Sequence, residues 1–190
     1  GEFPDDAQVR STLEGCGMHR LTGDMEYVLS EDGRLVPQNL LSDTQGLLPK
    51  LNYNAIAQGY SCDLVAEYLY SIGVKDMMVD IGGEVVLQGV NDKGNAWRVG
   101  ITRPTIDATG AEKELQEVIE SSDLCMATSG NYLQYYFVDG QRRSHTIDPR
   151  SGYPVEHSLL SATVVASSGM RADALATACM VLGEQEALAM

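Results

Sequence analysis

The sequence predicts an α+β fold in which antiparallel sheets pack against helices. Short apolar stretches, alternating or rich in β-branched residues, are separated by turn residues, which is typical of hairpins. Two other stretches, residues 57–72 and 172–182, repeat apolar side chains at helical spacing, and a glycine follows each one. Since the hairpins do not alternate with helices in a regular series, the sequence argues against a βαβ architecture. We expect one domain over residues 1–190.

The first half of the chain follows this scheme element by element. Residues 1–15 are polar with a helical pattern, and residues 18–37 alternate around Asp32 and Gly33, a turn pair that predicts a hairpin. The apolar residues over 57–72 predict the first long helix. The remaining predicted elements are a loop over 42–49, strands over 76–81 and 85–88 on either side of Gly82 and Gly83, a turn over 91–94 and a strand over 97–101.

The second half adds strands and a second long helix. The β-branched residues over 160–166 predict a strand, and the apolar run over 172–182 predicts a helix that ends at Gly183. Residues 115–121 fit more than one type of element. The other predicted elements are a loop over 105–114, strands over 124–127 and 132–138 that flank a polar turn at 128–131, a turn at 139–140 and the start of a last helix before Met190.

The composition excludes several classes of protein. The chain has 190 residues, 44% of them hydrophobic, which argues against disorder, and no apolar run approaches the length of a membrane span. With a net charge of −14, it lacks the basic stripe of a nucleic-acid binder. An anionic ligand would therefore need a cation, backbone N–H groups or one or two well-placed bases. The four cysteines have no metal-ligand spacing, so we expect buried thiols rather than a disulfide.

Residues 144–154 form the segment richest in candidate chemistry. This turn-rich segment contains His145, one of only three histidines, together with an acid, a base and two prolines. His145 could serve as a general base, because histidine exchanges protons near neutral pH, or it could hydrogen-bond its own loop. Asp148 precedes Pro149, a position typical of turn initiation.

Asp173 and Thr177 offer hard oxygen ligands. They lie four residues apart, so a helix over 172–182 places both side chains on one face. A carboxylate, a hydroxyl and a carbonyl would suit Mg²⁺, which prefers oxygen ligands and keeps several water molecules. The alternative is that Asp173, an acid near the start of a helix, serves as a cap or as a partner of the helix dipole.

Three further segments could approach a ligand closely. Residues 54–60 open the first long helix, where backbone N–H groups favour a phosphate, and Gly59 is costly in a helix unless something approaches it. Gly82 and Gly83, and the polar segment 128–131, could likewise admit a ligand to the backbone. Ordinary tight or polar turns are the alternative in both places.

Taken in chain order, five motifs resemble those of the ApbE family, the FAD:protein FMN transferases. They are residues 54–60 with Asp63, residues 80–84, residues 128–132, the histidine segment and residues 172–177. The resemblance runs over residues 51–183. It implies an ApbE-like fold related to the T-fold, truncated at both ends relative to the family, and a single, partial flavin transferase domain.

Members of this family use Mg²⁺ and FAD, cleave the pyrophosphate, attach FMN through a phosphoester to a threonine of a target protein, and release AMP. The resemblance implies that Asp173, Thr177 and the Ala55 carbonyl hold the metal, while Ala176 stands where some members have a further acid. The implied cofactor-binding residues are Asn52, Gln58, Gly82, Gly83, Ser129 and the Ile147 backbone. Asn52 stands where many members have Asp, and Gln58 where many have an acid or a lysine.

A general base would deprotonate the incoming threonine hydroxyl, and His145 is the candidate, with Asp173 as the alternative through a metal-bound group. FAD pyrophosphatase activity, giving FMN and AMP, and flavin binding without turnover are the alternative functions. The family implies acceptors among the subunits of Rnf-type or Na⁺-translocating NADH:quinone oxidoreductases, and no nucleic-acid partner. It also implies a periplasmic inner-membrane lipoprotein that meets the membrane only through a lipid anchor outside this chain.

Overall fold

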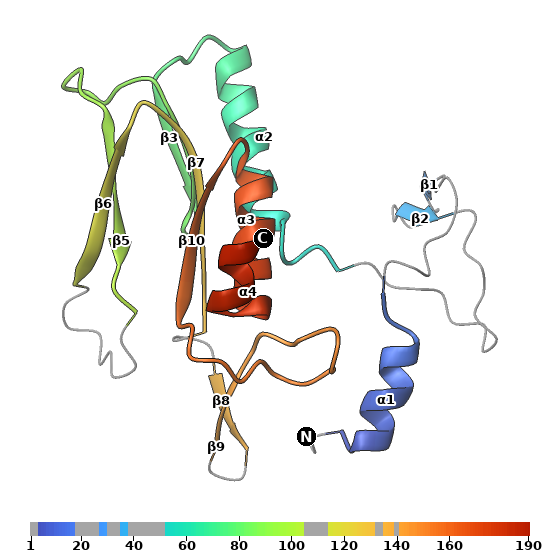
Figure 1. The fold of residues 1–190 in the computed structure, drawn as a ribbon. Helices are drawn as coiled ribbons and strands as arrows, with labels where there is room; N and C mark the ends of the chain where they lie inside the picture. Colours follow the sequence, from blue (N-terminus) through green and yellow to red (C-terminus); the bar gives the residue numbers. More distant parts are fainter. Residues whose placement is uncertain are drawn as a thin grey trace. The chain divides into compact units, whose positions relative to one another are not determined.

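The computed structural model in Figure 1 describes residues 4–17, 27–29, 35–37, 52–104, 114–131, 135–138 and 141–190. The chain divides into two compact units, which are residues 1–52 with 147–153 and residues 53–146 with 154–190. The expectation of a single domain over the chain stays a prediction. No helix in the described ranges is long and apolar enough to cross a lipid bilayer.

The first unit contains helix α1 (Asp6–Glu14), which confirms the helix expected near the start of the chain. A reciprocal capping box begins this helix. The Asp5 carboxylate accepts the Gln8 N–H at 2.8 Å, and the Gln8 side chain accepts the Asp5 N–H at 2.9 Å. Two of the orphan donors at the helix start are satisfied in this way, so the sequence specifies where α1 begins.

A short hairpin follows α1 in the same unit. Strand β1 (Tyr27–Leu29) pairs antiparallel with strand β2 (Leu35–Pro37), which confirms the hairpin expected over 18–37. The turn expected at Asp32 and Gly33 and the loop expected over 42–49 lie outside the described residues.

The second unit is built on a four-stranded antiparallel sheet with the strand order β10-β7-β4-β3. Its strands are β3 (Met77–Ile81), β4 (Glu84–Gln88), β7 (Asp123–Gly130) and β10 (Ser161–Ala166). These bounds confirm the strands expected over 76–81, 85–88 and 160–166. β4 lies between β3 and β7, and every residue from Glu84 to Leu87 is buried.

Figure 1 shows this sheet between two other layers, a two-stranded β-ribbon on one side and helices on the other. The ribbon consists of β5 (Trp97–Thr102) and β6 (Leu115–Ser121), so the ambiguous segment 115–121 is a strand. Val85 and Leu87 of β4 pack on the ribbon side. Because side chains alternate along a strand, the intervening β4 residues face the helices.

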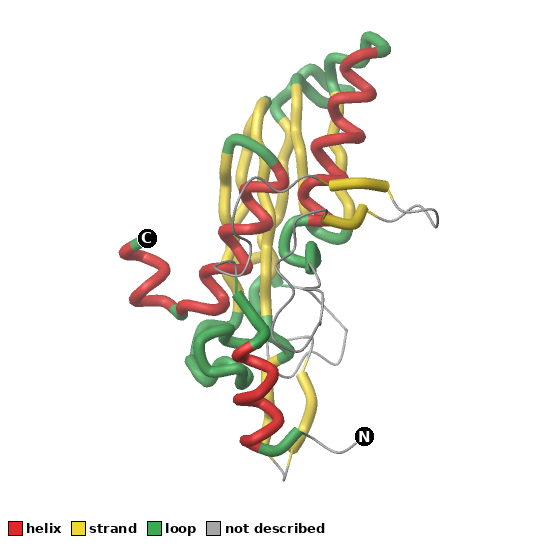
Figure 2. Tube along the Cα trace, turned by 90° about the vertical axis from the view of Figure 1, so that its right-hand side faces the viewer, coloured by secondary structure: helices red, strands yellow, loops and turns green. Residues whose placement is uncertain are grey.

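Two long helices cover the other face of the sheet (Figures 1 and 2). Helix α2 (Ala57–Ser71) packs on β3 and β4, and α3 (Gly169–Leu182) packs on β7 and β10. Val86 of β4 joins Cys62 and Ala66 of α2 in the core on this side. The helix expected over 57–72 is therefore confirmed, and it occupies the layer that its apolar residues require.

The helix expected over 172–182 is confirmed but begins earlier, at Gly169. The Ser168 hydroxyl accepts the Arg171 N–H at 3.2 Å and caps the first turn. Apolar periodicity starts only after this turn, which explains the later start predicted from the sequence. Gly183, with φ of 78°, ends α3 and precedes a last helix, α4 (Glu184–Ala189).

The polar turn expected at 128–131 is wrong for its first three residues, because β7 continues to Gly130. Residues 128–130 pair in register with residues 161–163 of β10, and this backbone pairing overrides their polar composition. A separate hairpin follows, made of β8 (Tyr135–Val138) and β9 (Gln141–Ser144). The four cysteines carry free thiols, as expected, but only Cys62 is buried. Cys125 and Cys179 are half-buried, and the expectation of a buried thiol is wrong for Cys16, which is exposed.

Candidate functional site

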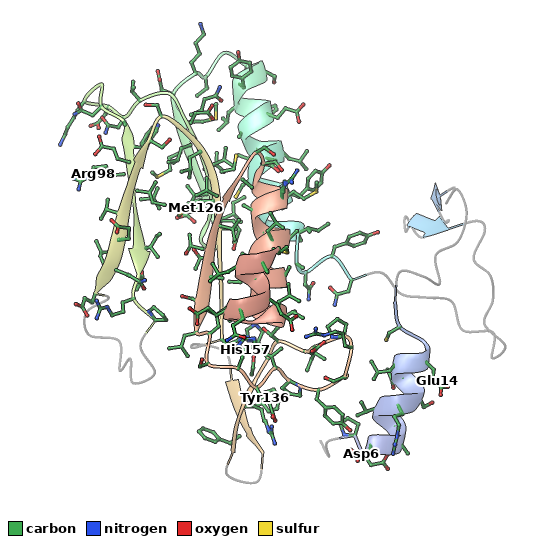
Figure 3. The ribbon with its side chains drawn as sticks, viewed as in Figure 1. Asp6, Glu14, Arg98, Met126, Tyr136 and His157 are labelled. Carbon is green, nitrogen blue, oxygen red and sulfur yellow. The ribbon has the colours of Figure 1, made fainter. Side chains whose placement is uncertain are left out.

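A cavity of about 810 Å³ in the second unit collects side chains from several elements. Its walls come from the start of α2, the β3–β4 turn, β4, β5, the end of β7, residues 145–146 and α3. Met126 of β7, labelled in Figure 3, forms part of the apolar wall and belongs to the core between the sheet and the ribbon. Gln58, Asp173 and Thr177 of the two helices form a polar wall, beside which Ala57 and Met180 also line the cavity.

The crossing of α2 and α3 places the first acid of the polar wall. A Cβ atom added to Gly59 would lie 2.2 Å from the Gly169 carbonyl oxygen and 2.8 Å from the Asp173 Cβ. Only glycine therefore allows the two helices to approach this closely. The Gly59 N–H donates to Asp173 Oδ2 at 3.0 Å, and Asp173 is 4% exposed.

Asp173 is not the cap of its own helix, because Ser168 has that role. It instead accepts an N–H from the first turn of α2, whose N-cap residue, Ile56, makes no side-chain capping bond. Asp173 therefore caps the start of the neighbouring helix α2 rather than the start of its own helix. A carboxylate at this helix end is also favoured by the helix dipole. Asp173 lines the cavity as well, so it can face a ligand while it holds α2.

Asp63 makes the reciprocal contact at the same crossing. Its carboxylate accepts the Gly169 N–H at 2.6 Å and the Met170 N–H at 2.9 Å. Each helix therefore supplies an acid that satisfies orphan N–H groups at the start of the other helix. The resulting fixed crossing holds Asp173 at the cavity wall.

Hydroxyl groups continue the polar wall one helical turn beyond Asp173. Thr177 Oγ1 lies 3.3 Å from Ser129 Oγ of β7, and both residues line the cavity. Asp173, Thr177 and Ser129 therefore present oxygen atoms to the same space. These are the ligand atoms that hard divalent cations such as Mg²⁺ prefer. Among the described residues, no three His, Cys, Asp or Glu side chains group as a metal site, so such a cation would depend on hydroxyl and carbonyl oxygens as well.

Glu84, the first residue of β4, is a second buried acid in the cavity wall. It is 5% exposed, and its Oε2 atom has no hydrogen-bond partner. Burial, and after it the negative charge of Asp173, raises the pKa of Glu84 to about 7. The motif 80–84 contains this residue, but sequence reasoning gave it no role. The available signal was an acid directly after two glycines at the start of an apolar strand.

Beside Glu84, the thiol of Cys62 donates to the Glu84 carbonyl oxygen at 3.1 Å. Burial is the main cause that raises the pKa of Cys62 to about 11. The thiol therefore stays protonated and unreactive at neutral pH, which fits the expectation that it packs as a small apolar residue.

The β3–β4 turn brings backbone to the cavity. Gly82 and Gly83 have φ of 70° and 106°, which L side chains rarely adopt, and the Gly83 N–H donates to the Asp80 carboxylate at 3.0 Å. A Cβ atom on Gly82 would lie 2.2 Å from the Gln58 Nε2 atom. The tight-turn interpretation is therefore correct, and the Gln58 side chain occupies the space above Gly82. The approach of a ligand to this backbone stays a prediction.

His145 is exposed and lines the cavity together with Thr146. The Thr146 hydroxyl donates to the Asn131 side-chain oxygen at 2.7 Å, which ties this segment to the end of β7. In the first unit, the backbone carbonyl oxygen of Asp148 accepts the Gly152 N–H at 2.7 Å. The side-chain carboxylate of Asp148 forms an ion pair with the Arg150 guanidinium. The hydrogen bonds from Arg150 lower the pKa of Asp148, and the turn role expected for this acid fits these contacts.

The cavity thus brings together seven of the predicted site residues, which are Gln58, Gly82, Gly83, Ser129, His145, Asp173 and Thr177. Ala55 lies in the turn before α2, between the cavity-lining residues Asn54 and Ala57, and does not itself line the cavity. Asn52 and Ile147 belong to the first unit. The cofactor-binding, metal-binding and catalytic roles of all ten predicted residues stay predictions.

Comparison with known proteins identifies a shared family. The sequence model of the ApbE family matches residues 1–190. A FAD:protein FMN transferase of Vibrio cholerae is 44% identical over 144 residues, which are 75% of this chain and 42% of that protein. The FAD:protein FMN transferase of Haemophilus influenzae is 41% identical over 185 residues, 97% of this chain and 50% of that protein. The chain spans about half the length of the curated relatives it matches.

Solved structures give the same result. The apo form of the flavinyl transferase ApbE of Pseudomonas stutzeri matches with a TM-score of 0.74 and 33% identity, covering 99% of this chain and 52% of that chain. The flavin transferase ApbE of Vibrio cholerae matches with a TM-score of 0.74 and 34% identity, covering 99% of this chain and 54% of that chain. These matches confirm the expected α+β, ApbE-like fold.

Proposed function

Because the chain belongs to the ApbE family, we propose that it takes part in transferring FMN from FAD to a threonine of a target protein, with release of AMP. The single observation that carries this proposal is the cavity in the second unit. It collects residues from all five motifs around a wall of carboxylate and hydroxyl oxygens. The names of the relatives supply the reaction, and the cavity supplies a place for it.

The proposed reaction is a phosphoryl-type displacement. The threonine oxygen attacks the phosphorus on the FMN side of the pyrophosphate, a new P–O bond forms, and the P–O bond to AMP breaks. The hydroxyl proton passes to a base, for which His145 is the candidate because it lines the cavity on an exposed segment. AMP leaves with the bridging oxygen.

In this proposal, Asp173, Thr177 and the Ala55 carbonyl hold Mg²⁺. When bound, the ion neutralises charge on the pyrophosphate and stabilises the leaving AMP. The chain's own residues position the substrate. N–H groups at the start of α2 favour phosphate, and the backbone at Gly82 and Gly83 can approach it closely.

The finer assignments are also proposals from family resemblance. Asn52, Gln58 and the Ile147 backbone are proposed to contact the flavin. The proposed acceptors are subunits of Rnf-type or Na⁺-translocating NADH:quinone oxidoreductases. The proposed location is the periplasmic face of the inner membrane, as a lipoprotein.

The test is to incubate the protein with FAD and Mg²⁺, with and without a threonine-containing acceptor, and to measure AMP release and acceptor mass. AMP with an FMN-sized adduct on the acceptor supports the transferase. AMP with free FMN and no adduct would favour a FAD pyrophosphatase, and flavin binding without AMP would favour a flavin-binding protein. An acceptor whose threonine is replaced by valine is the matched control.

The variant to test in this assay is Asp173→Asn. Asparagine keeps an oxygen that can accept the Gly59 N–H, whereas alanine would leave this buried donor unpaired. We expect Asp173→Asn to lose Mg²⁺-dependent turnover at least about 100-fold while it stays folded. Glu67→Gln, on the exposed face of α2, is the control and should keep full activity. Full activity in Asp173→Asn would contradict the metal assignment.

A further inference from the structure

Glu84 is a buried acid whose position the fold does not explain. It begins β4, the inner strand whose next three residues are the apolar core residues Val85, Val86 and Leu87. It is 5% exposed, and its Oε2 atom accepts no hydrogen bond. Burying a carboxylate oxygen without a hydrogen-bond partner costs free energy of folding. The unpartnered oxygen therefore indicates a ligand rather than a contribution to stability.

Nearby acids differ from Glu84 in this respect. The Asp63 carboxylate accepts two N–H groups of α3, the Asp80 carboxylate accepts the Gly83 N–H, and Asp173 accepts the Gly59 N–H. Each of these acids has a structural hydrogen bond within the described residues. In contrast to these acids, Glu84 has a buried carboxylate oxygen, Oε2, that is free to contact a ligand.

The charge around Glu84 specifies what that group is. The cavity is lined by three acids, which are Asp80, Glu84 and Asp173, and His145 is the basic residue among its described lining residues. Burial is the main cause that raises the pKa of Glu84, the charge of Asp173 comes next, and the charge of the exposed Asp80 contributes least. A site for an anionic pyrophosphate that carries this much negative charge requires a cation between the acids and the ligand.

We propose that Glu84 is a second carboxylate of the cation site, facing a divalent, oxygen-preferring cation such as Mg²⁺ or Mn²⁺ together with Asp173. This inference rests on the proposed function, because Asp173 and Thr177 are the metal-holding residues of that proposal. It adds an acid from the β3–β4 motif to a site otherwise formed by the helices.

The test measures cation binding directly. Mn²⁺ binding is followed by electron paramagnetic resonance and Mg²⁺ binding by isothermal titration calorimetry, at pH 8, in the wild type, Glu84→Gln and Asp80→Asn. Glutamine keeps the shape of the side chain and removes its charge. Asp80→Asn removes a charge at the same cavity but keeps an oxygen for the Gly83 N–H. Circular dichroism shows whether each variant is folded.

We expect Glu84→Gln to bind Mn²⁺ and Mg²⁺ roughly 10–100-fold more weakly than the wild type. Asp80→Asn should change the affinity by less than about threefold, because its exposed charge is screened by solvent. AMP release by Glu84→Gln should recover as Mg²⁺ is raised.

Equal cation affinity in the wild type and Glu84→Gln would overturn the inference and leave the proposed function standing. Equal losses in Glu84→Gln and Asp80→Asn would also overturn it, because they would indicate a general charge effect. Weaker FAD binding without weaker cation binding would overturn it by making Glu84 an acceptor for the organic ligand. No cation binding by the wild type would overturn both the inference and the proposed metal site. Weaker cation binding in a protein that releases no AMP would support the inference while the proposed reaction fails.

Discussion

The α2–α3 crossing and the start of β4 each place a buried acid in the wall of the same cavity, Asp173 and Glu84, and the two acids differ in their hydrogen bonds. At the crossing, Asp63 and Asp173 accept N–H groups from the start of the neighbouring helix. At the start of β4, Glu84 is as buried as Asp173, and its Oε2 atom has no partner. The comparison shows that the carboxylates of the crossing hold the two helices together, and that Asp173 also lines the cavity, whereas the Oε2 atom of Glu84 is engaged by no hydrogen bond of the described residues and is left for a ligand.

The largest expected loss of stability comes from a substitution that disrupts the α2–α3 crossing. In Gly59→Ala, the new Cβ would lie 2.2 Å from the Gly169 carbonyl oxygen, so the helices must separate and the Asp173 hydrogen bond must weaken. We expect the free energy of unfolding to fall by about 3 kcal/mol or more, despite the better helix propensity of alanine. Urea denaturation measures this loss.

Gly100→Ala is the matched control for that substitution. Its Cβ would meet only the end of the Leu115 side chain, at 2.6 Å, and a flexible side chain can move. We expect a change within about 1 kcal/mol. Equal losses in the two variants would show that the helix crossing is not the constrained place described here.

The next prediction concerns Glu84 and the dependence of the free energy of unfolding on pH. Because the pKa of Glu84 is raised to about 7 from its ordinary value near 4.5, the folded protein binds a proton between these values that the unfolded chain does not. The resulting stability is fully present below about pH 4.5 and is lost as the pH rises through 7. This group alone therefore lowers the free energy of unfolding by about 3 kcal/mol between pH 4.5 and pH 8.

Glu84→Gln should remove that loss, since glutamine does not titrate. In a chelating buffer, the variant should match the wild type near pH 4.5 and exceed it in stability at pH 8. Urea denaturation at both pH values checks the expectation. A variant with the same pH dependence as the wild type would show that Glu84 is not the acid responsible.

The smallest of the three effects concerns Asp63. In the wild type, the Asp63 carboxylate accepts two α3 N–H groups in charge-assisted hydrogen bonds. Asp63→Asn replaces it with a neutral amide, whose NH₂ group cannot accept a hydrogen bond from either N–H. We expect a loss of about 2 kcal/mol in the free energy of unfolding. Glu67→Gln, one turn further along α2 and exposed, should change stability by less than about 0.5 kcal/mol. A loss below that value in Asp63→Asn would contradict the capping role.

Most of the fold could be predicted from local patterns, because each long element carries its own period and end signals. The hairpin around Gly82 and Gly83 and the helix α2 follow directly from such signals. The start of α3 was placed late, since its first turn is defined by the Ser168 cap rather than by apolar residues. The sequence predicts a turn at the end of β7, because no local pattern reveals that these polar residues pair with β10.

The sequence predicts which motifs belong to the candidate site, but it does not predict the contacts between their side chains. Seven predicted residues line one cavity, which the order of motifs alone could not establish. The structural role of Asp173 on α2 depends on the closeness of Gly59 and Gly169 across the helix crossing. The lack of a hydrogen-bond partner for the Oε2 atom of Glu84 is likewise a property of the folded arrangement, which the sequence alone does not reveal.

The measurement that tests the contrast between the two regions most directly is thermal unfolding at pH 8, in chelator and in saturating Mg²⁺, for the wild type, Asp63→Asn and Glu84→Gln. A cation that binds only the folded protein raises its Tm. We predict that in chelator Asp63→Asn melts below the wild type and Glu84→Gln above it. We further predict that Mg²⁺ raises the Tm of the wild type and Asp63→Asn alike, and that of Glu84→Gln much less. A Glu84→Gln protein that melts below the wild type in chelator, or that gains as much from Mg²⁺, would contradict the account.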